Sequence, residues 1–173
     1  MKIQMNKIRC SLLPHDAKLK NFEVFGELQT AFIWNEKTER NDILILEDIR
    51  FVLKKYDIEV IVKPGFICDG GSVPRAFWSS VGSPYATRLL LAFILHDALY
   101  GAEVFPTHSE CDWIFLELMQ ELGSSWYTRN KVWLAVRAFG GTVWSEHDED
   151  SIATARTFIE KIDIHPKQRK NQK

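Results

Sequence analysis

The residues best suited to chemistry lie near the middle of the chain. His96 and Asp97 end a long apolar stretch, Tyr100 follows His96 by four residues, and Asp112 comes later, near the start of the next apolar segment. A carboxylate on one imidazole nitrogen fixes the tautomer and raises the basicity of the other nitrogen. With Asp112 beside it, His96 is able to activate a water molecule. Water is the expected nucleophile because no serine or cysteine has the context of an activated one.

A second candidate is the glycine-rich segment that carries Asp69, Gly70, Gly71 and Ser72. Its carboxylate and carbonyl oxygens suit a hard cation such as Ca²⁺. Its backbone N–H groups suit an oxyanion instead. A tight turn in which Asp69 caps its own loop explains the same residues without any ligand. The pattern leaves these interpretations open.

Two further side chains near these positions need partners. His108 and Asp112 are four residues apart, a spacing that suits metal ligands, so a zinc set with His96 is one option and a surface role for His108 is the other. Arg137 lies in a very apolar segment and is predicted to pair with an acid, the candidates being Asp69, Asp97 and Asp112. Substrate binding is the alternative role for this arginine. The remaining histidines have no partner at a matching spacing and are assigned no role: His15, His147 and His165.

Alternation of apolar and polar residues predicts strands in the first part of the chain. Residues 22–34 form two strand-like stretches broken at Gly26. The runs 49–54 and 58–62 flank a short polar break, which predicts an antiparallel hairpin. We expect at most one short strand before residue 20.

Apolar residues three or four apart predict four helices, over residues 85–100, 107–122, 125–139 and 150–162. The second should begin with a capping box formed by Thr107 and Glu110. The third should stop at the glycine pair Gly140-Gly141. The fourth is expected to bury one apolar face, made of Ile152, Ala155, Phe158 and Ile159.

Strands first and helices afterwards is the order typical of the α+β class. We expect a small antiparallel sheet from the N-terminal half, packed against three or four helices from the C-terminal half. No internal repeat or linker divides the chain, so residues 1–165 are predicted to form a single domain. Residues 166–173 are predicted to be a disordered basic tail.

Composition narrows the class of function. Hydrophobic residues make up 46% and charged residues 26%, as in ordinary globular proteins. A formal net charge of -1 argues against nucleic-acid binding, which needs a basic face. Three cysteines without zinc-site spacing indicate reduced thiols in the cytoplasm. The chain begins without the apolar run of a signal peptide, and no apolar run is long enough for a transmembrane segment.

Four motifs occur in order along the chain: Gly65-Phe66-Ile67-Cys68-Asp69-Gly70-Gly71-Ser72-Val73-Pro74-Arg75, His96-Asp97-Ala98-Leu99-Tyr100, Cys111-Asp112-Trp113-Ile114-Phe115 and Ala135-Val136-Arg137-Ala138-Phe139-Gly140. Together they resemble a phage and prophage family, the domain of unknown function 1353, over about residues 43 to 145. Cys111 stands where members usually have alanine, and His108 where many have arginine. The resemblance implies a phage or prophage origin, hence the cytoplasm of a host cell, and no particular reaction.

The pattern His96-Asp97-x-x-Tyr100 followed by Asp112 also resembles the core of phospholipase A2. That resemblance implies that His96 is the base, that Asp112 orients it, and that Asp97 binds Ca²⁺ together with the loop Asp69-Gly70-Gly71. The disulfides of secreted phospholipases are missing here, and the strands come before the helices, so membrane lipid is one substrate among several.

Three functions fit these residues. The first is a phage-encoded hydrolase, with Ca²⁺ as a possible cofactor, whose catalytic residues are His96, Tyr100 and Asp112 with Ser72 and Arg137 in support. The second is a non-catalytic phage accessory protein that binds a host or virion partner, in which the His/Asp/Arg cluster is a structural polar network. The third is a phosphohydrolase with a His-Asp metal doublet, although the additional histidines of such sites are missing.

Overall fold

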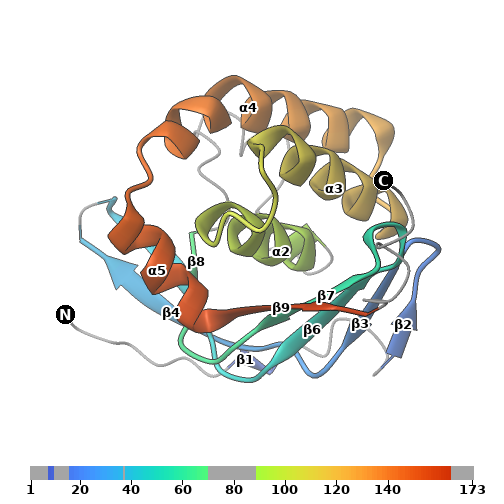
Figure 1. The fold of residues 1–173 in the computed structure, drawn as a ribbon, viewed down its shortest axis with the longest axis horizontal. Helices are drawn as coiled ribbons and strands as arrows, with labels where there is room; N and C mark the ends of the chain where they lie inside the picture. The colour runs from blue at the N-terminus through green and yellow to red at the C-terminus, as the bar shows by residue number, and fades with distance from the viewer. Residues whose placement is uncertain (1–7, 10–15, 37, 70–88, 165–173) are drawn as a thin grey trace, which may run out of the picture.

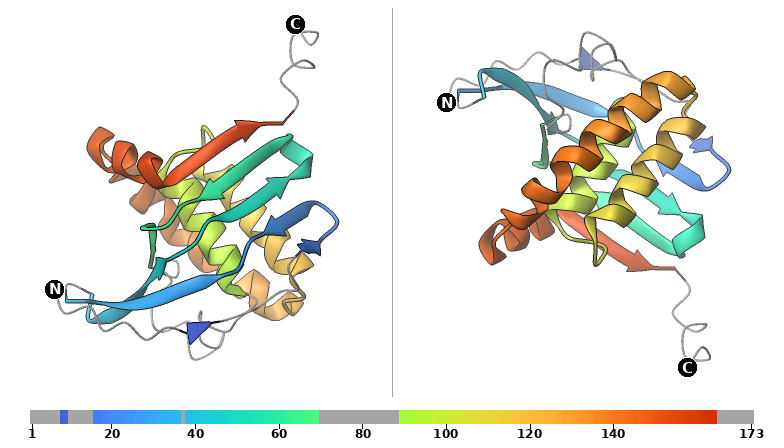
Figure 2. Two further views of the ribbon diagram at one scale, coloured as in Figure 1. Left: turned by 90° about the horizontal axis from the view of Figure 1, so that it is seen from below. Right: turned by 90° about the horizontal axis from the view of Figure 1, so that it is seen from above.

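The computed structural model of the chain describes residues 8–9, 16–36, 38–69 and 89–164. The strands form two antiparallel sheets, and the helices gather on one side of them (Figure 1). Seen from below the strands lie in front of the helices, and seen from above the helices lie in front (Figure 2). The fold class is α+β, as predicted.

The first sheet has four strands in the order β1-β4-β5-β8. Their bounds are β1 Ile8–Arg9, β4 Gln29–Asn35, β5 Arg40–Ile45 and β8 Ile67–Cys68. The short strand β8 pairs with β5, and Cys68 lies opposite Ile43. This pairing anchors the chain immediately before Asp69, the acid of the glycine-rich motif.

The second sheet has five strands in the order β2-β3-β6-β7-β9. Their bounds are β2 Asp16–Lys18, β3 Phe22–Phe25, β6 Ile49–Leu53, β7 Ile58–Val62 and β9 Ile159–Asp163. The expectation of at most one short strand before residue 20 is wrong, because β1 and β2 both lie there, each paired with a later strand. The predicted hairpin is confirmed, because β6 and β7 pair antiparallel with Phe51 opposite Val60. A 3₁₀ turn (Lys54–Tyr56) connects them, and Asp57 closes it at a φ of 52°, a region that aspartate tolerates better than most residues.

The last strand corrects the prediction of a helix over residues 150–162. Helix α5 (Glu149–Phe158) ends four residues earlier, and the chain continues as β9, with Ile159 opposite Val62. Strand β7 would otherwise present an unpaired edge of N–H and C=O groups, and pairing with β9 satisfies them. This long-range pairing outweighs the helical periodicity of the segment. Ile159 is buried, while the other three residues of the predicted apolar face are only half-buried.

Helix α2 (Leu89–Gly101) is the centre of the fold. It lies between the sheets and the other long helices, α3 (His108–Glu121) and α4 (Trp126–Ser145), as Figure 1 shows. Ten of its 13 residues are buried. A helix enclosed on all sides is apolar all round, which explains why His96 stands in an otherwise apolar segment. The predicted start of this helix, at 85–88, lies outside the described residues.

One detail of α3 differs from expectation, at its first turn. The Thr107 hydroxyl hydrogen-bonds to the Glu110 carboxylate at 3.0 Å and caps no backbone N–H, so the predicted capping box is wrong. At the other end the prediction holds, because α3 ends at Glu121, shortly before Gly123, whose φ is 82°. No helix within the described ranges is long and apolar enough to cross a lipid bilayer.

Helix α4 corrects the prediction of a stop at Gly140-Gly141, because it runs through both glycines to Ser145. The first glycine is buried and faces α2, where a Cβ atom would collide with the hydroxyl of Tyr100. Gly140 therefore permits a close approach of α2 and α4. Gly141 is exposed, and the nearest heavy atom to a Cβ there would be 3.8 Å away, in His108.

The two glycines give a matched test of this packing. Gly140→Ala should lower the free energy of unfolding by about 1–3 kcal/mol, because the methyl group displaces Tyr100 in a packed core. Gly141→Ala should raise it by about 0.5–1 kcal/mol, because alanine is the better helix former and the space is open. Urea denaturation of both variants measures these changes. If both substitutions raised the free energy of unfolding, or both lowered it, the proposed close approach of α2 and α4 would be contradicted.

Candidate functional site

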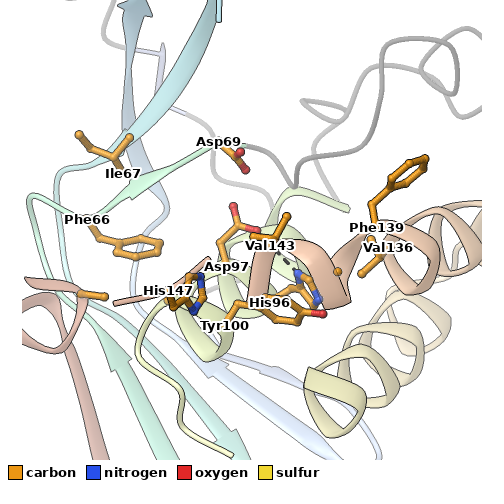
Figure 3. A pocket seen from close by; sticks show the side chains of 13 residues that line it. Phe66, Ile67, Asp69, His96, Asp97, Tyr100, Val136, Phe139, Val143 and His147 are labelled. Atoms are coloured by element: carbon orange, nitrogen blue, oxygen red, sulfur yellow. Dashed lines mark ion pairs between the residues drawn. The ribbon is translucent and has the colours of Figure 1, made fainter. Parts of the chain in front are cut away.

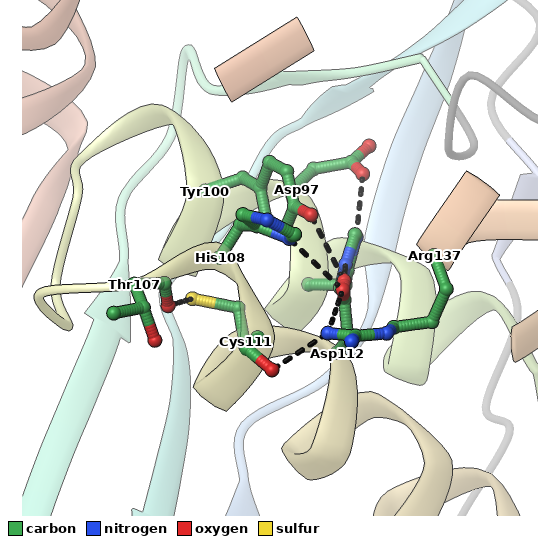
Figure 4. A network of polar contacts seen from close by, with 9 residues as sticks. Asp97, Tyr100, Thr107, His108, Cys111, Asp112 and Arg137 are labelled. Atoms are coloured by element: carbon green, nitrogen blue, oxygen red, sulfur yellow. Dashed lines mark hydrogen bonds and ion pairs between the residues drawn. The ribbon is translucent and has the colours of Figure 1, made fainter. Parts of the chain in front are cut away.

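The predicted catalytic side chains come together where three helices meet. His96 lies on α2. Tyr100 is also on α2, Asp112 is on the first turns of α3, and Arg137 is on α4 (Figure 4). The short connection between α2 and α3 turns the chain back, so that the end of one helix faces the beginning of the next. The sequence-based expectation that Asp112 lies beside His96 is met by the geometry.

Asp112 has an exposed fraction of 0% and is surrounded by donors. Its Oδ1 accepts hydrogen bonds from His96 Nε2 at 3.0 Å and Tyr100 Oη at 2.9 Å. Its Oδ2 lies 3.3 Å from His108 Nδ1 and 3.5 Å from Arg137 Nη1. Burial alone would raise the pKa of Asp112, but the hydrogen bonds from His96, Tyr100 and His108 hold that pKa below its usual 3.8. The carboxylate is therefore ionised and can only accept hydrogen bonds.

The state of His96 follows from that of Asp112. Because an ionised carboxylate offers no proton, Nε2 of His96 carries the hydrogen, and in the neutral ring Nδ1 holds a lone pair. Nδ1 is buried, lies 3.7 Å from Asp97 Oδ1, and hydrogen-bonds to none of the described residues. Burial lowers the pKa of His96, but the carboxylates of Asp112 and Asp97 outweigh burial and leave that pKa above 6.5.

Packing fixes the orientation of the imidazole. Its ring centroid lies 4.4 Å from that of Tyr100 and 4.7 Å from that of Phe115. Burial and the nearby Asp112 raise the pKa of the Tyr100 hydroxyl, which stays protonated and acts as a donor. Burial likewise raises the pKa of the Cys111 thiol, so this cysteine is inert as a nucleophile.

Arg137 finds its acid among the predicted candidates, namely Asp112. It also donates a hydrogen bond of 2.6 Å to Ser109 Oγ, and its guanidinium lies 5.8 Å from the ring centroid of Trp133. Its side chain is 36% exposed although its partner is fully buried. The arginine thus closes the outer side of the cluster.

A cavity of about 300 Å³, partly open to solvent, adjoins His96 (Figure 3). It lies between β8 and the helices α2, α4 and α5. Its polar lining consists of Asp69, His96, Asp97, Tyr100 and His147. Its apolar lining consists mainly of Phe66, Ile67, Val136, Phe139 and Val143. A concave apolar site with a few convergent polar groups is the usual form of a small-molecule site.

The two acids predicted to bind Ca²⁺, Asp69 and Asp97, both border this cavity. Asp97 Oδ2 also accepts a hydrogen bond from the Cys68 thiol at 2.9 Å. The other predicted members, Gly70, Gly71 and Ser72, lie outside the described residues.

The zinc alternative is wrong for the part of the chain that the structure describes. There, no group of three or more His, Cys, Asp or Glu side chains is placed to hold a metal ion. His96 and His108 instead use their nitrogens as donors to the two oxygens of Asp112.

His147, to which the sequence assigned no role, lines the same cavity. It follows the end of α4, and its Nδ1 lies 3.4 Å from Glu103 Oε1, in the connection between α2 and α3. The premature stop expected at Gly140-Gly141 concealed this placement. A helix continued to Ser145 would have placed His147 at its C-terminal end, but nothing in the sequence indicates the contact with Glu103.

The chain matches the family described as "Protein of unknown function (DUF1353)" over residues 43–136. The match covers more than half of the chain, so this protein belongs to that family, as the four motifs predicted. Comparisons with curated proteins and with solved structures give no match. Asp69, His96, Asp97 and Asp112 all lie within the matched residues, whereas His147 lies beyond them.

The coupling of Asp112 to His96 should appear in the pH dependence of stability. Asp112 has a lowered pKa, so its contribution is present above pH 3.8 and lost as the pH falls through the folded value. His96 has a raised pKa, so its contribution is present below pH 6.5 and lost as the pH rises through the folded value. Asp112→Asn should therefore lower the free energy of unfolding most between pH 3.8 and pH 6.5, by about 3 kcal/mol, and by less at pH 9.

Urea denaturation at pH 5 and pH 9 measures this difference. A matched control is Asp42→Asn in β5, another buried carboxylate, which accepts a 2.7 Å hydrogen bond from Asn35, a residue that does not titrate. Its cost should be similar at the two pH values. If Asp112→Asn lowered the free energy of unfolding equally at pH 5 and pH 9, His96 would not be coupled to Asp112.

Proposed function

We propose that this protein is a phage-encoded hydrolase, acting in the host cytoplasm, in which His96 activates water against a substrate held in the cavity. One observation carries the proposal: Nε2 of His96 is fixed by a buried carboxylate, while Nδ1 has no hydrogen-bond partner among the described residues and belongs to a cavity-lining ring. An unsatisfied buried polar atom costs about 1–3 kcal/mol. A water molecule or a substrate in the cavity would satisfy it.

In the proposed reaction the lone pair of Nδ1 accepts a proton from water as the hydroxide adds to the substrate. The imidazolium that forms lies between two carboxylates, since Asp112 is at Nε2 and Asp97 at Nδ1. General-base catalysis of this kind contributes about 10²–10⁴-fold. Tyr100 acts through Asp112, because its hydrogen bond helps to keep that carboxylate in place. Arg137 supports Asp112 from the opposite side.

The cavity wall favours substrates with an apolar part. Phenylalanine, isoleucine and valine side chains form most of it, and His96 is among the few polar side chains (Figure 3). An ester or amide with an acyl or aryl group would place its carbonyl carbon near His96 and bury its hydrocarbon part against this wall.

We further propose Ca²⁺ as an assisting ion, with Asp97 and Asp69 among its ligands. Both carboxylates border the cavity and are the hard oxygen donors that Ca²⁺ prefers. The ion would supply positive charge that polarises a substrate carbonyl. The resemblance of the His96-Asp97 pattern to phospholipase A2 supports this part of the proposal.

A second candidate is a non-catalytic phage accessory protein that binds a host or virion protein. The observation in its favour is a set of exposed apolar side chains on α4: Trp126 at 69%, Tyr127 at 58% and Leu134 at 60%. Aromatic residues of this kind are enriched in protein interfaces. In this function the cluster around Asp112 serves stability alone.

The hydrolase makes a direct prediction for His96→Gln. The glutamine amide reaches the position of Nε2 and keeps a donor for Asp112, while the basic Nδ1 is removed. Hydrolysis in a panel of nitrophenyl esters, anilides and phosphate esters should fall by about 100-fold or more. In the wild type the rate should increase with pH through the pKa of His96, above 6.5, because only the neutral ring accepts a proton.

Asp42→Asn is the control, because it alters a buried acid that does not line the cavity. It should keep the wild-type rate. A folded wild-type protein that hydrolyses nothing in the panel, with a destabilised Asp112→Asn variant, would favour the accessory protein instead.

The calcium proposal has its own test. Chelation with EGTA should lower the rate, and Ca²⁺ should restore it better than Mg²⁺. Ca²⁺ should also raise the melting temperature by mass action in the wild type and not in Asp97→Asn. Full activity in EGTA, together with an unchanged melting temperature in millimolar Ca²⁺, would show that the reaction needs no calcium.

A further inference from the structure

We propose that His147 is the general acid of this site and protonates the leaving group. The inference rests on the proposed hydrolase, in which His96 is the base. It adds a second catalytic residue that lies outside the family match and outside the motifs. Its starting point is that two histidines line one cavity (Figure 3). Asp112 lies at Nε2 of His96, and Glu103 lies beside Nδ1 of His147.

The two histidines present opposite nitrogens to their carboxylates. His96 Nε2 donates a hydrogen bond to Asp112, whereas His147 Nδ1 is buried, lies 3.4 Å from Glu103 Oε1 and hydrogen-bonds to none of the described residues. We place Nε2 as the nitrogen that meets a molecule in the cavity, because His147 lines the cavity and Nδ1 is the nitrogen beside Glu103. In the protonated ring both nitrogens carry hydrogen, so Glu103 stabilises the charge at Nδ1 while Nε2–H is free to donate.

The tertiary structure holds Glu103 in place. Its backbone has a φ of 46°, and its N–H donates to the carbonyl of Tyr100 at 3.0 Å. The carbonyl of the preceding residue, Ala102, accepts a 2.9 Å hydrogen bond from Arg156 Nε on α5. The carboxylate thus projects from a connection secured to both α2 and α5.

His147 has other charged and titratable neighbours. Asp148, the next residue, accepts a hydrogen bond of 2.7 Å from the backbone N–H of Ser151 and caps α5. The other polar residues that line the cavity are Asp69, His96, Asp97 and Tyr100. The charged groups nearest in the chain and in the cavity are thus mostly acidic.

For an ester the step is balanced as follows. Water gives one proton to His96 Nδ1, and its oxygen bonds to the carbonyl carbon. The tetrahedral intermediate then breaks its bond to the alkoxy oxygen, which takes the electron pair and the Nε2 proton of His147. The products are a carboxylic acid and an alcohol, and solvent returns the proton of His96 to His147.

This role predicts a dependence on the leaving group. An alkoxide leaves poorly without a proton, whereas nitrophenolate is a stable anion that needs none. His147→Asn keeps an amide nitrogen at the position of Nδ1 for Glu103 and removes the acidic Nε2–H. It should slow hydrolysis of ethyl butyrate by about 100-fold and leave that of nitrophenyl butyrate near the wild-type rate.

His96→Gln, in contrast, should slow hydrolysis of both esters. Glu103→Gln serves as a second variant, because it removes the carboxylate beside Nδ1 of His147. It should slow hydrolysis of the ethyl ester alone. Equal losses on the two esters in His147→Asn, or no loss on either, would overturn the role of His147. Unchanged rates in His96→Gln, or no hydrolysis by the wild type, would overturn the hydrolase itself.

Discussion

The structure around the cavity depends on one fully buried carboxylate. Removing Asp112 from water would cost several kcal/mol without compensation, so the fold must supply donors from every side. It does so with four side chains, two from α2, one from α3 and one from α4. This requirement sets the relative positions of the three helices, and it also orients His96. A single desolvated charge thus links the stability of the core to the geometry of the site.

The donors of Asp112 are themselves held by close packing. Tyr100 reaches Asp112 from α2 while its hydroxyl lies where a Cβ at position 140 would be. Its ring also meets Trp144 edge-on at 5.2 Å. The approach of α2 to α4 therefore depends on a glycine inside a helix, a position where alanine has the better intrinsic propensity. Tertiary packing outweighs that local preference.

Much of the fold is encoded in local pattern. The period of two over residues 49–62 predicts β6 and β7 because a sheet with one buried face requires alternation. The end of α3 before Gly123 follows from the left-handed conformation that glycine adopts there. The errors in the bounds of helices concern segments with long-range partners. Gly140 is in a helix because of Tyr100, and residues 159–163 form β9 because β7 has an edge to pair.

The candidate site also has residues that local sequence predicts and residues that only the tertiary structure brings together. Residue type and spacing alone single out His96, Asp97, Tyr100 and Asp112, because all four lie on two consecutive helices joined by a short connection, and such helices bring their adjoining ends together. His147 and Glu103 are far apart in the chain and share no periodicity. Only the packing of the segment between α4 and α5 against the α2–α3 connection brings them together. Local sequence determines contacts between neighbours in the chain, whereas contacts between distant segments depend on how the whole core packs.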